Sequence, residues 1–198
     1  TDPEVAVDFT KGPEALELFR AAVPRNTSPV VGTTGMADEA LAEARALCEQ
    51  HSVGALIAPN FAIGAVLMMK FAQEAAKYLG DVEIIELHHE RKMDAPSGTA
   101  KRTAQLIAEA RTAQRAERPA TLDEAPGARG TEQHGVPIHS VRLPGLVAHQ
   151  EVLFGGVGQM LTIRHDSIDR TSFMPGVVLA IRRIRGHKGL LVGLENLL

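Results

Sequence analysis

"SPVVGTTGMADEALAEARALCEQHSVGALIAPN" (residues 28–60) decides the fold of the first part of the chain, because two short apolar runs flank an amphipathic helical pattern. We predict a strand at 28–35 that runs into a Gly-Thr loop, a helix at 37–51 with Asp38 as its N-cap, and a second strand at 53–60. Strands that alternate with helices form parallel sheets covered by helices on both faces. The stretch therefore predicts an α/β layer.

The same alternation extends upstream of this stretch. "VAVDF" (5–9) predicts a strand, and residues 12–22 predict a helix. In open α/β sheets, ligands bind at the loops that follow the carboxyl ends of the strands. Here these loops are Gly32-Thr33-Thr34-Gly35 and Ala58-Pro59-Asn60-Phe61.

A Gly-rich phosphate-binding turn normally follows the first strand of a doubly wound nucleotide domain. No G-x-G-x-x-G or similar spacing occurs near the start of this sequence. We therefore expect the sequence to begin partway through such a domain, without its phosphate-binding turn.

The pattern changes downstream, where strands follow one another without helices between them. We predict a partial Rossmann-like nucleotide-binding domain (1–61 and 172–198) and a second α+β domain (62–171) with a mixed or antiparallel sheet for substrate binding and oligomerisation. The predicted elements are helices at 62–79, 98–116 and about 172–186, a strand at 82–89, a long loop at 117–135, and an antiparallel meander of three strands in "PIHSVRLPG", "AHQEVLFGG" and "QMLTIRHDS". The tail "GLLVGLENLL" is expected to add a strand or to pack on the first domain.

The composition is that of an ordinary globular protein, with 44% hydrophobic and 23% charged residues and a net charge of −3. Nucleic-acid binding is disfavoured because it needs a basic surface. No apolar run approaches the roughly 20 residues of a membrane span, and the start resembles no signal peptide. The single cysteine, Cys48, is interpreted as part of an inward-facing helix surface. A cytoplasmic location is the expectation.

"ELHHERKMDAPSGTA" (86–100) concentrates ionisable side chains beside a predicted helix start. Successive strand residues point to opposite faces, so we expect only one of His88 and His89 to face a site. Ser97 or Thr99 is expected to cap the helix, and a glycine between them allows a ligand close to the backbone.

The free N–H groups of a helix start attract anions. Lys92 adds an ammonium group, and a histidine carries a proton near neutral pH. This combination predicts a site for a small carboxylate substrate that gains or loses a proton. The alternatives are a capped helix with core histidines and a metal site made of His88, His89, Glu90 and Asp94, which the nearby lysine disfavours.

This stretch resembles the signature of the 4-hydroxy-tetrahydrodipicolinate reductase (dihydrodipicolinate reductase) family, Glu-x-His-His-x-x-Lys-x-Asp-Ala-Pro-Ser-Gly-Thr-Ala, throughout its length. Further stretches are similar to the family along essentially the whole chain. They are "VDFT" (7–10), "VVGTTG" (30–35), "APNFAIG" (58–64), "HSVRLPGLVAHQEVLFG" (139–155) and "LTIRHDSIDRTSF" (161–173).

The resemblance implies an NADH- or NADPH-dependent reduction of a cyclic unsaturated dicarboxylate in diaminopimelate and lysine biosynthesis. It implies His88 as the general acid and Lys92 as the group that holds and polarises the substrate. His89, Gly98 and Thr99 would bind the substrate. The residues that it places along the cofactor are Gly32, Thr33, Thr34, Gly35, Ala58, Pro59, Asn60 and Phe61. A weaker assignment brings Arg129 and Gly130 toward the substrate.

Family resemblance also implies a homotetramer built through the second-domain sheet, and no metal. The family's Gly-rich N-terminal turn has no counterpart here, so the activity of this chain and its choice between NADH and NADPH stay open. The alternative function is a catalytically weak carboxylate-binding or assembly domain of the same fold. His139, His149 and His165, in the predicted meander, are interpreted as structural or interface residues.

Overall fold

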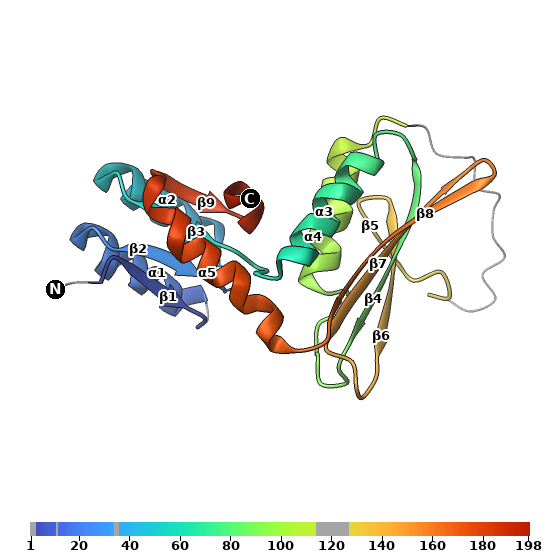
Figure 1. The fold of residues 1–198 in the computed structure, drawn as a ribbon, viewed down its shortest axis with the longest axis horizontal. Coiled ribbons are helices and arrows are strands. Elements are labelled where there is room, and N and C mark those ends of the chain that lie inside the picture. The colour runs from blue at the N-terminus through green and yellow to red at the C-terminus, as the bar shows by residue number, and fades with distance from the viewer. Residues whose placement is uncertain (1–2, 11, 34–35, 114–126) are drawn as a thin grey trace. The chain divides into compact units, whose positions relative to one another are not determined.

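The computed structural model describes residues 3–10, 12–33, 36–113 and 127–198. The chain forms two compact units (Figure 1). The first comprises Thr1–Val66 and Thr171–Leu198, and the second comprises Leu67–Arg170. None of the described helices is long and apolar enough to cross a membrane.

The first unit contains a four-stranded parallel sheet in the order β1-β2-β3-β9. Its strands are β1 (Val5–Asp8), β2 (Ser28–Val31), β3 (Gly54–Ile57) and β9 (Gly189–Val192). Its helices are α1 (Gly12–Ala22), α2 (Asp38–His51) and α5 (Met174–Arg183), with short 3₁₀ turns at Val23–Arg25, Ile184–Gly186 and Leu194–Leu197. A further 3₁₀ turn, Arg170–Phe173, begins at the last residue of the second unit. The predicted α/β layer is confirmed, and the tail returns to it as β9.

The core of this sheet is buried on both faces, as its β-α order requires. Phe19 of α1 and Cys48 of α2 pack with Val31 and Ile57 on one face. Val30, which points the other way, is also fully buried, and α5 contacts its strand. The inward interpretation of Cys48 is confirmed, and burial raises the pKa of its thiol to about 11.

The second unit contains a five-stranded mixed sheet in the order β5-β6-β4-β7-β8. These strands are β4 (Asp81–His88), β5 (Thr131–Gln133), β6 (Val136–Arg142), β7 (Ala148–Gly156) and β8 (Gln159–Ser167). Helices α3 (Ile63–Ala75) and α4 (Gly98–Ala110) lie on one side of the sheet in Figure 1. A hydrogen bond of 2.8 Å from Gln150 Nε2 to Thr103 Oγ1 ties β7 to α4.

The predicted antiparallel meander is wrong. Strand β4 lies between β6 and β7, parallel to β6 and antiparallel to β7, and only β7 and β8 form the predicted hairpin. The physical reason is the burial of β4, whose Val82, Ile84 and Glu86 alternate into the core and require a strand on each side. The β6–β7 connection therefore passes the carboxyl end of β4.

Several predicted ends differ from the observed ones. Asp38 is the first residue of α2 rather than its N-cap; the N-cap is Ala37, which makes no side-chain capping bond. Helix α4 ends at Ala110 because Arg111 is already extended. Part of the predicted long loop, residues 117–126, lies outside the described residues.

Candidate active site

The candidate site lies at the carboxyl end of β4, where three elements of the second unit meet. Backbone pairing places His88 opposite Arg142 of β6 and Ala148 of β7. The N–H of Leu143 donates to the His88 carbonyl at 3.1 Å, and Arg142 Nη2 donates to the Asp94 carbonyl at 2.8 Å. These bonds fix the loop between β4 and α4 against β6.

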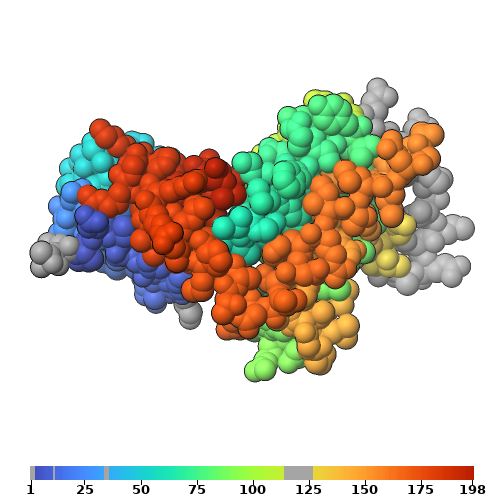
Figure 2. Space-filling view, in the orientation of Figure 1, coloured from blue at the N-terminus to red at the C-terminus, as the bar shows by residue number. Residues whose placement is uncertain are grey.

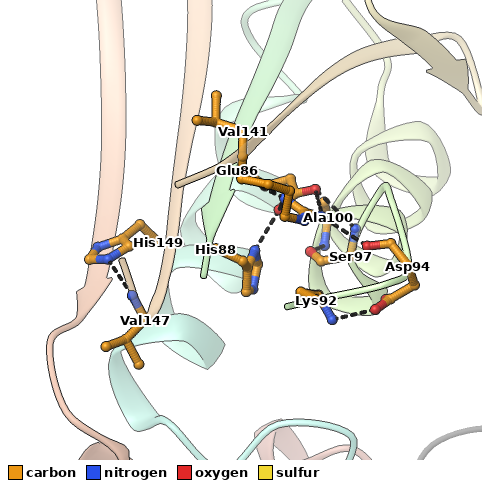
Figure 3. Close-up of polar contacts among 10 residues, drawn as sticks. Glu86, His88, Lys92, Asp94, Ser97, Ala100, Val141, Val147 and His149 are labelled. Atoms are coloured by element: carbon orange, nitrogen blue, oxygen red, sulfur yellow. Dashed lines mark hydrogen bonds and ion pairs between the residues drawn. The ribbon is translucent and has the colours of Figure 1, made fainter. Parts of the chain in front are cut away.

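Glu86 is the centre of a buried polar network, with none of its surface exposed (Figure 3). Its Oε2 lies 2.5 Å from His88 Nδ1. Arg142 donates to both oxygens, at 2.7 Å from Nη2 to Oε1 and 2.9 Å from Nη1 to Oε2. The Ser97 backbone N–H donates to Oε1 at 3.3 Å. Burial alone would raise the pKa of this carboxyl, but hydrogen bonds from His88, Arg142 and Ser140 outweigh it and lower the pKa to about 2.

The His88 ring meets this network through its Nδ1. A carboxylate only accepts hydrogen bonds, so Nδ1 carries a proton and is the donor of the hydrogen bond to Glu86. Proton exchange with another molecule would then use the second nitrogen, Nε2. The His88 side chain is 14% exposed, which gives it partial access to solvent.

Lys92 lies on the loop that follows the strand. Its Nζ is 2.6 Å from Asp94 Oδ1, and this hydrogen bond is the main cause of a lowered pKa for the Asp94 carboxyl. The pair is partly exposed, with 22% of the lysine side chain and 54% of the aspartate side chain accessible. An exposed pair of this kind is weak, so Lys92 is able to exchange its partner for an anionic ligand.

Helix α4 begins beside this network. Ser97 is its N-cap, and Ser97 Oγ accepts a hydrogen bond of 3.2 Å from the Ala100 N–H, which confirms the predicted cap. Gly98 is exposed, and a methyl group added there would meet no atom within 4 Å. The first turn of α4 is therefore open at Gly98, where an anionic group can approach the backbone.

His89 lies beyond the end of β4 and lines a pocket of about 480 Å³. The other lining residues also belong to the second unit and include both charges and apolar groups. They are Glu90, Arg91, Leu146, Val147, Asp169 and Arg170.

The predicted cofactor loops follow β2 and β3, whose carboxyl ends share one edge of the parallel sheet. Gly32 is packed so tightly that a Cβ there would lie 2.2 Å from Phe9 Cε1. Phe61 contacts the same Phe9 ring at a centroid distance of 5.6 Å, and Asn60 Oδ1 accepts from the Ala62 N–H at 2.8 Å. Thr34 and Gly35 lie outside the described residues.

Both loops lie at the edge of a parallel sheet where nucleotides bind. Pro59 is exposed and Asn60 is half-buried, so these two residues offer apolar and polar surface that a nicotinamide cofactor could contact, whereas Thr33, Ala58 and Phe61 are buried. In the described residues, the carboxyl ends of β1, β2 and β3 are held together by backbone bonds from Gly32 N to Asp8 O at 2.7 Å and from Ala58 N to Val31 O at 2.9 Å.

The remaining histidines of the sheet have acidic partners away from Glu86. His139 Nε2 lies 2.8 Å from Glu83 Oε2, on the opposite face of β4, and Arg129 Nη2 pairs with the same carboxylate. His149 Nδ1 lies 2.7 Å from Asp166 Oδ1. Burial lowers the pKa of His165. Within the described ranges, no group of three histidine, cysteine or acidic side chains is arranged to hold a metal.

The sequence reasoning missed Glu86 and Arg142. Glu86 occupies the third inward position of β4, after Val82 and Ile84, and an acid at such a position is a signal of a buried polar network. Arg142 carries no comparable signal, because its contact with the glutamate joins residues 56 apart in the sequence.

Two family models cover nearly the whole chain. The model of the N-terminus of dihydrodipicolinate reductase matches residues 1–61, and the model of its C-terminus matches residues 64–198. The 4-hydroxy-tetrahydrodipicolinate reductase of Halalkalibacterium halodurans is 58% identical over 98% of this chain and 74% of its own length. That of Mycolicibacterium gilvum is 57% identical over 100% of this chain and 81% of its own length.

A solved structure agrees with these matches. The dipicolinate-bound dihydrodipicolinate reductase from Paenisporosarcina sp. TG-14 superposes with a TM-score of 0.90 at 52% identity, covering 99% of this chain and 74% of that one.

Proposed function

Because the chain belongs to the dihydrodipicolinate reductase family, we propose that His88 and Lys92 perform the proton and substrate chemistry of an NAD(P)H-dependent reductase. The reaction is the reduction of 4-hydroxy-tetrahydrodipicolinate in lysine and diaminopimelate biosynthesis, and the enzyme is an oxidoreductase. When bound, the nicotinamide cofactor, NADH or NADPH, supplies the hydride.

His88 acts as the general acid in this proposal. The 4-hydroxyl group leaves as water, and reduction of the resulting unsaturated ring adds a hydride to one carbon and a proton to its neighbour. The site therefore needs a proton donor. Support comes from the bond between Nδ1 and Glu86, which leaves Nε2 for proton transfer. This contact is the single observation that carries the assignment. General acid catalysis contributes about 10²–10⁴-fold to turnover.

Lys92 and the start of α4 hold the dicarboxylate. Lys92 releases Asp94 and binds a carboxylate or the negative charge that develops on the substrate. The backbone at Gly98 and the N–H and hydroxyl of Thr99 bind the other carboxylate, a role supported by the open space at Gly98. His89 contacts the substrate from the pocket that it lines.

The cofactor is assigned to the first unit. Gly32 and Thr33, with Thr34 and Gly35, and the segment Ala58-Pro59-Asn60-Phe61 lie along its nicotinamide half. The proposed domains are residues 1–61 and 172–198 for cofactor and 62–171 for substrate and assembly. Support comes from the position of both loops after strands of the parallel sheet.

A homotetramer and a cytoplasmic location complete the proposal. Assembly through the five-stranded sheet is supported by its edge strand β8, which lies at the surface in Figure 2 and exposes 72% of Met160 and 40% of Leu161. A long edge strand with apolar side chains is a surface that proteins cover.

The experiment that tests the function follows the absorbance of NADH and of NADPH after addition of 4-hydroxy-tetrahydrodipicolinate. We expect oxidation of at least one cofactor that depends on the substrate and is inhibited competitively by dipicolinate. Dipicolinate binding without any cofactor oxidation would instead identify a carboxylate-binding module.

A further inference from the structure

Glu86 and Arg142 form a buried ion pair that contacts His88, and the chemistry proposed above gives neither residue a role of its own. We propose that Glu86, held in place by Arg142, is the positioning residue that fixes the ring orientation and tautomer of His88 for proton transfer. The inference rests on the proposed function of His88 and deepens it, since it assigns to a buried carboxylate the task of aiming the acid.

The geometry supports positioning because every oxygen of Glu86 is committed. Oε2 accepts from His88 at 2.5 Å and from Arg142 Nη1 at 2.9 Å, while Oε1 accepts from Arg142 Nη2 at 2.7 Å and from the Ser97 N–H at 3.3 Å. A carboxylate held by two fixed elements and a backbone amide cannot rotate, so the histidine bonded to it is held as well.

Charge supports the same conclusion. A buried anion needs a partner, and Arg142 supplies a two-pronged one. Oε2 also faces the imidazole, so it accepts the Nδ1–H bond both before and after the ring gives up its Nε2 proton. Other charged groups near the network are Lys92 and Asp94 on the loop, and the facing position of β7 holds a neutral residue, Gln150.

The same network joins the acid to the proposed anion site. Ser97 donates its N–H to Glu86 and accepts the Ala100 N–H at its hydroxyl. Arg142 also donates to the backbone carbonyl of Asp94, whose side-chain carboxylate accepts a hydrogen bond from Lys92. Glu86 and Arg142 therefore connect the three groups proposed to handle the dicarboxylate.

The variant Glu86→Gln tests this role. Arg142 only donates hydrogen bonds, so the amide oxygen will turn toward it and the amide NH₂ toward His88 Nδ1. A neutral ring is then forced to carry its proton on Nε2. The imidazolium form, with a proton on each nitrogen, is disfavoured. Replacement of an orienting carboxylate by its amide lowers turnover by about 10⁴-fold in serine proteases. We expect a loss of about 10²-fold or more in kcat.

A second glutamate on strand β4 provides a matched control. Glu83 lies on the same strand, pairs with His139 and Arg129, and points to the opposite face. Glu83→Gln breaks the same kind of contact and is expected to leave turnover and its pH profile unchanged. In Glu86→Gln, by contrast, turnover is expected to fall because the ring tautomer has changed.

Nitrogen-15 NMR of the His88 ring in the resting enzyme gives a readout independent of turnover. We expect the Nδ1–H tautomer in the wild type and the Nε2–H tautomer in Glu86→Gln. If the neutral wild-type ring carries its proton on Nε2, the inference is overturned, and this measurement does not depend on whether any variant folds. An unchanged tautomer in the variant would also overturn it. If His88→Ala has normal turnover while the tautomer follows Glu86, the proposed acid role fails and the positioning contact stands.

Discussion

Glu86 is an acid at a position where its strand otherwise buries aliphatic side chains. An isolated buried charge is strongly unfavourable. The Arg142 guanidinium and the Ser97 backbone N–H offset this cost for Glu86. Since the pKa of the Glu86 carboxyl is lowered to about 2, the folded protein binds this proton less readily than the unfolded chain does. That difference couples stability to pH.

The stability contribution of Glu86 is fully present above the unfolded pKa of about 4.3 and is lost as pH falls toward 2. We predict that the wild type loses about 3 kcal/mol more unfolding free energy between pH 5 and pH 2 than Glu86→Gln does, measured by urea unfolding. Equal slopes for wild type and Glu86→Gln would contradict the assignment.

Lys92 gives a second prediction at the level of a single side chain. Lys92→Ala should raise the KM for the dicarboxylate by about 10- to 100-fold, because a hydrogen bond to a charged group contributes about 1.5–3 kcal/mol. Steady-state kinetics with varied substrate measure this. Lys77→Ala removes a comparable ion pair with Glu74 on α3 and should have no such effect. A substrate dependence identical to that of the wild type would remove Lys92 from the site.

At the level of elements, helix α4 links stability to substrate binding through its cap. Ser97 satisfies the Ala100 N–H and donates its own N–H to Glu86. A helix start whose first amides are organised in this way is ready to hold an anion.

Ser97→Ala should destabilise the protein by about 1 kcal/mol through loss of the capping bond, as measured by thermal or urea unfolding. Helix α2 provides the reverse case, because its N-cap is Ala37, with extended backbone and no capping bond. Ala37→Ser should therefore stabilise the protein by a similar amount. An unchanged unfolding free energy in Ser97→Ala would show that the capping bond does not contribute to stability.

Local patterns predicted most elements of the fold because apolar periodicity and cap residues are properties of short stretches. The strands of the parallel sheet and the Ser97 cap were found in this way. Strand order in the second sheet was not, since the insertion of β4 between β6 and β7 depends on which strand is most buried. His88 and Lys92 lie in one short motif, so the sequence identifies them as candidates. Arg142 is 56 residues from Glu86 in the sequence, and only the folded chain reveals their contact.

At the level of the whole molecule, β8 is an uncovered edge of the second sheet in the described chain. If it forms the subunit interface, light scattering should give four chain masses for the wild type and a smaller particle for Met160→Lys. Val157→Lys, at the fully exposed hairpin tip, is the matched control and should leave the mass unchanged. A monomeric wild type would rule out the tetramer.

The central claim is that His88 donates the proton in a nicotinamide-dependent reduction, and one comparison tests it most directly. Turnover of 4-hydroxy-tetrahydrodipicolinate is measured for the wild type and for His88→Ala, together with the Kd of the cofactor for each. The account predicts a kcat about 10²–10⁴-fold lower in His88→Ala at unchanged cofactor affinity. Equal kcat values in the two proteins would contradict it.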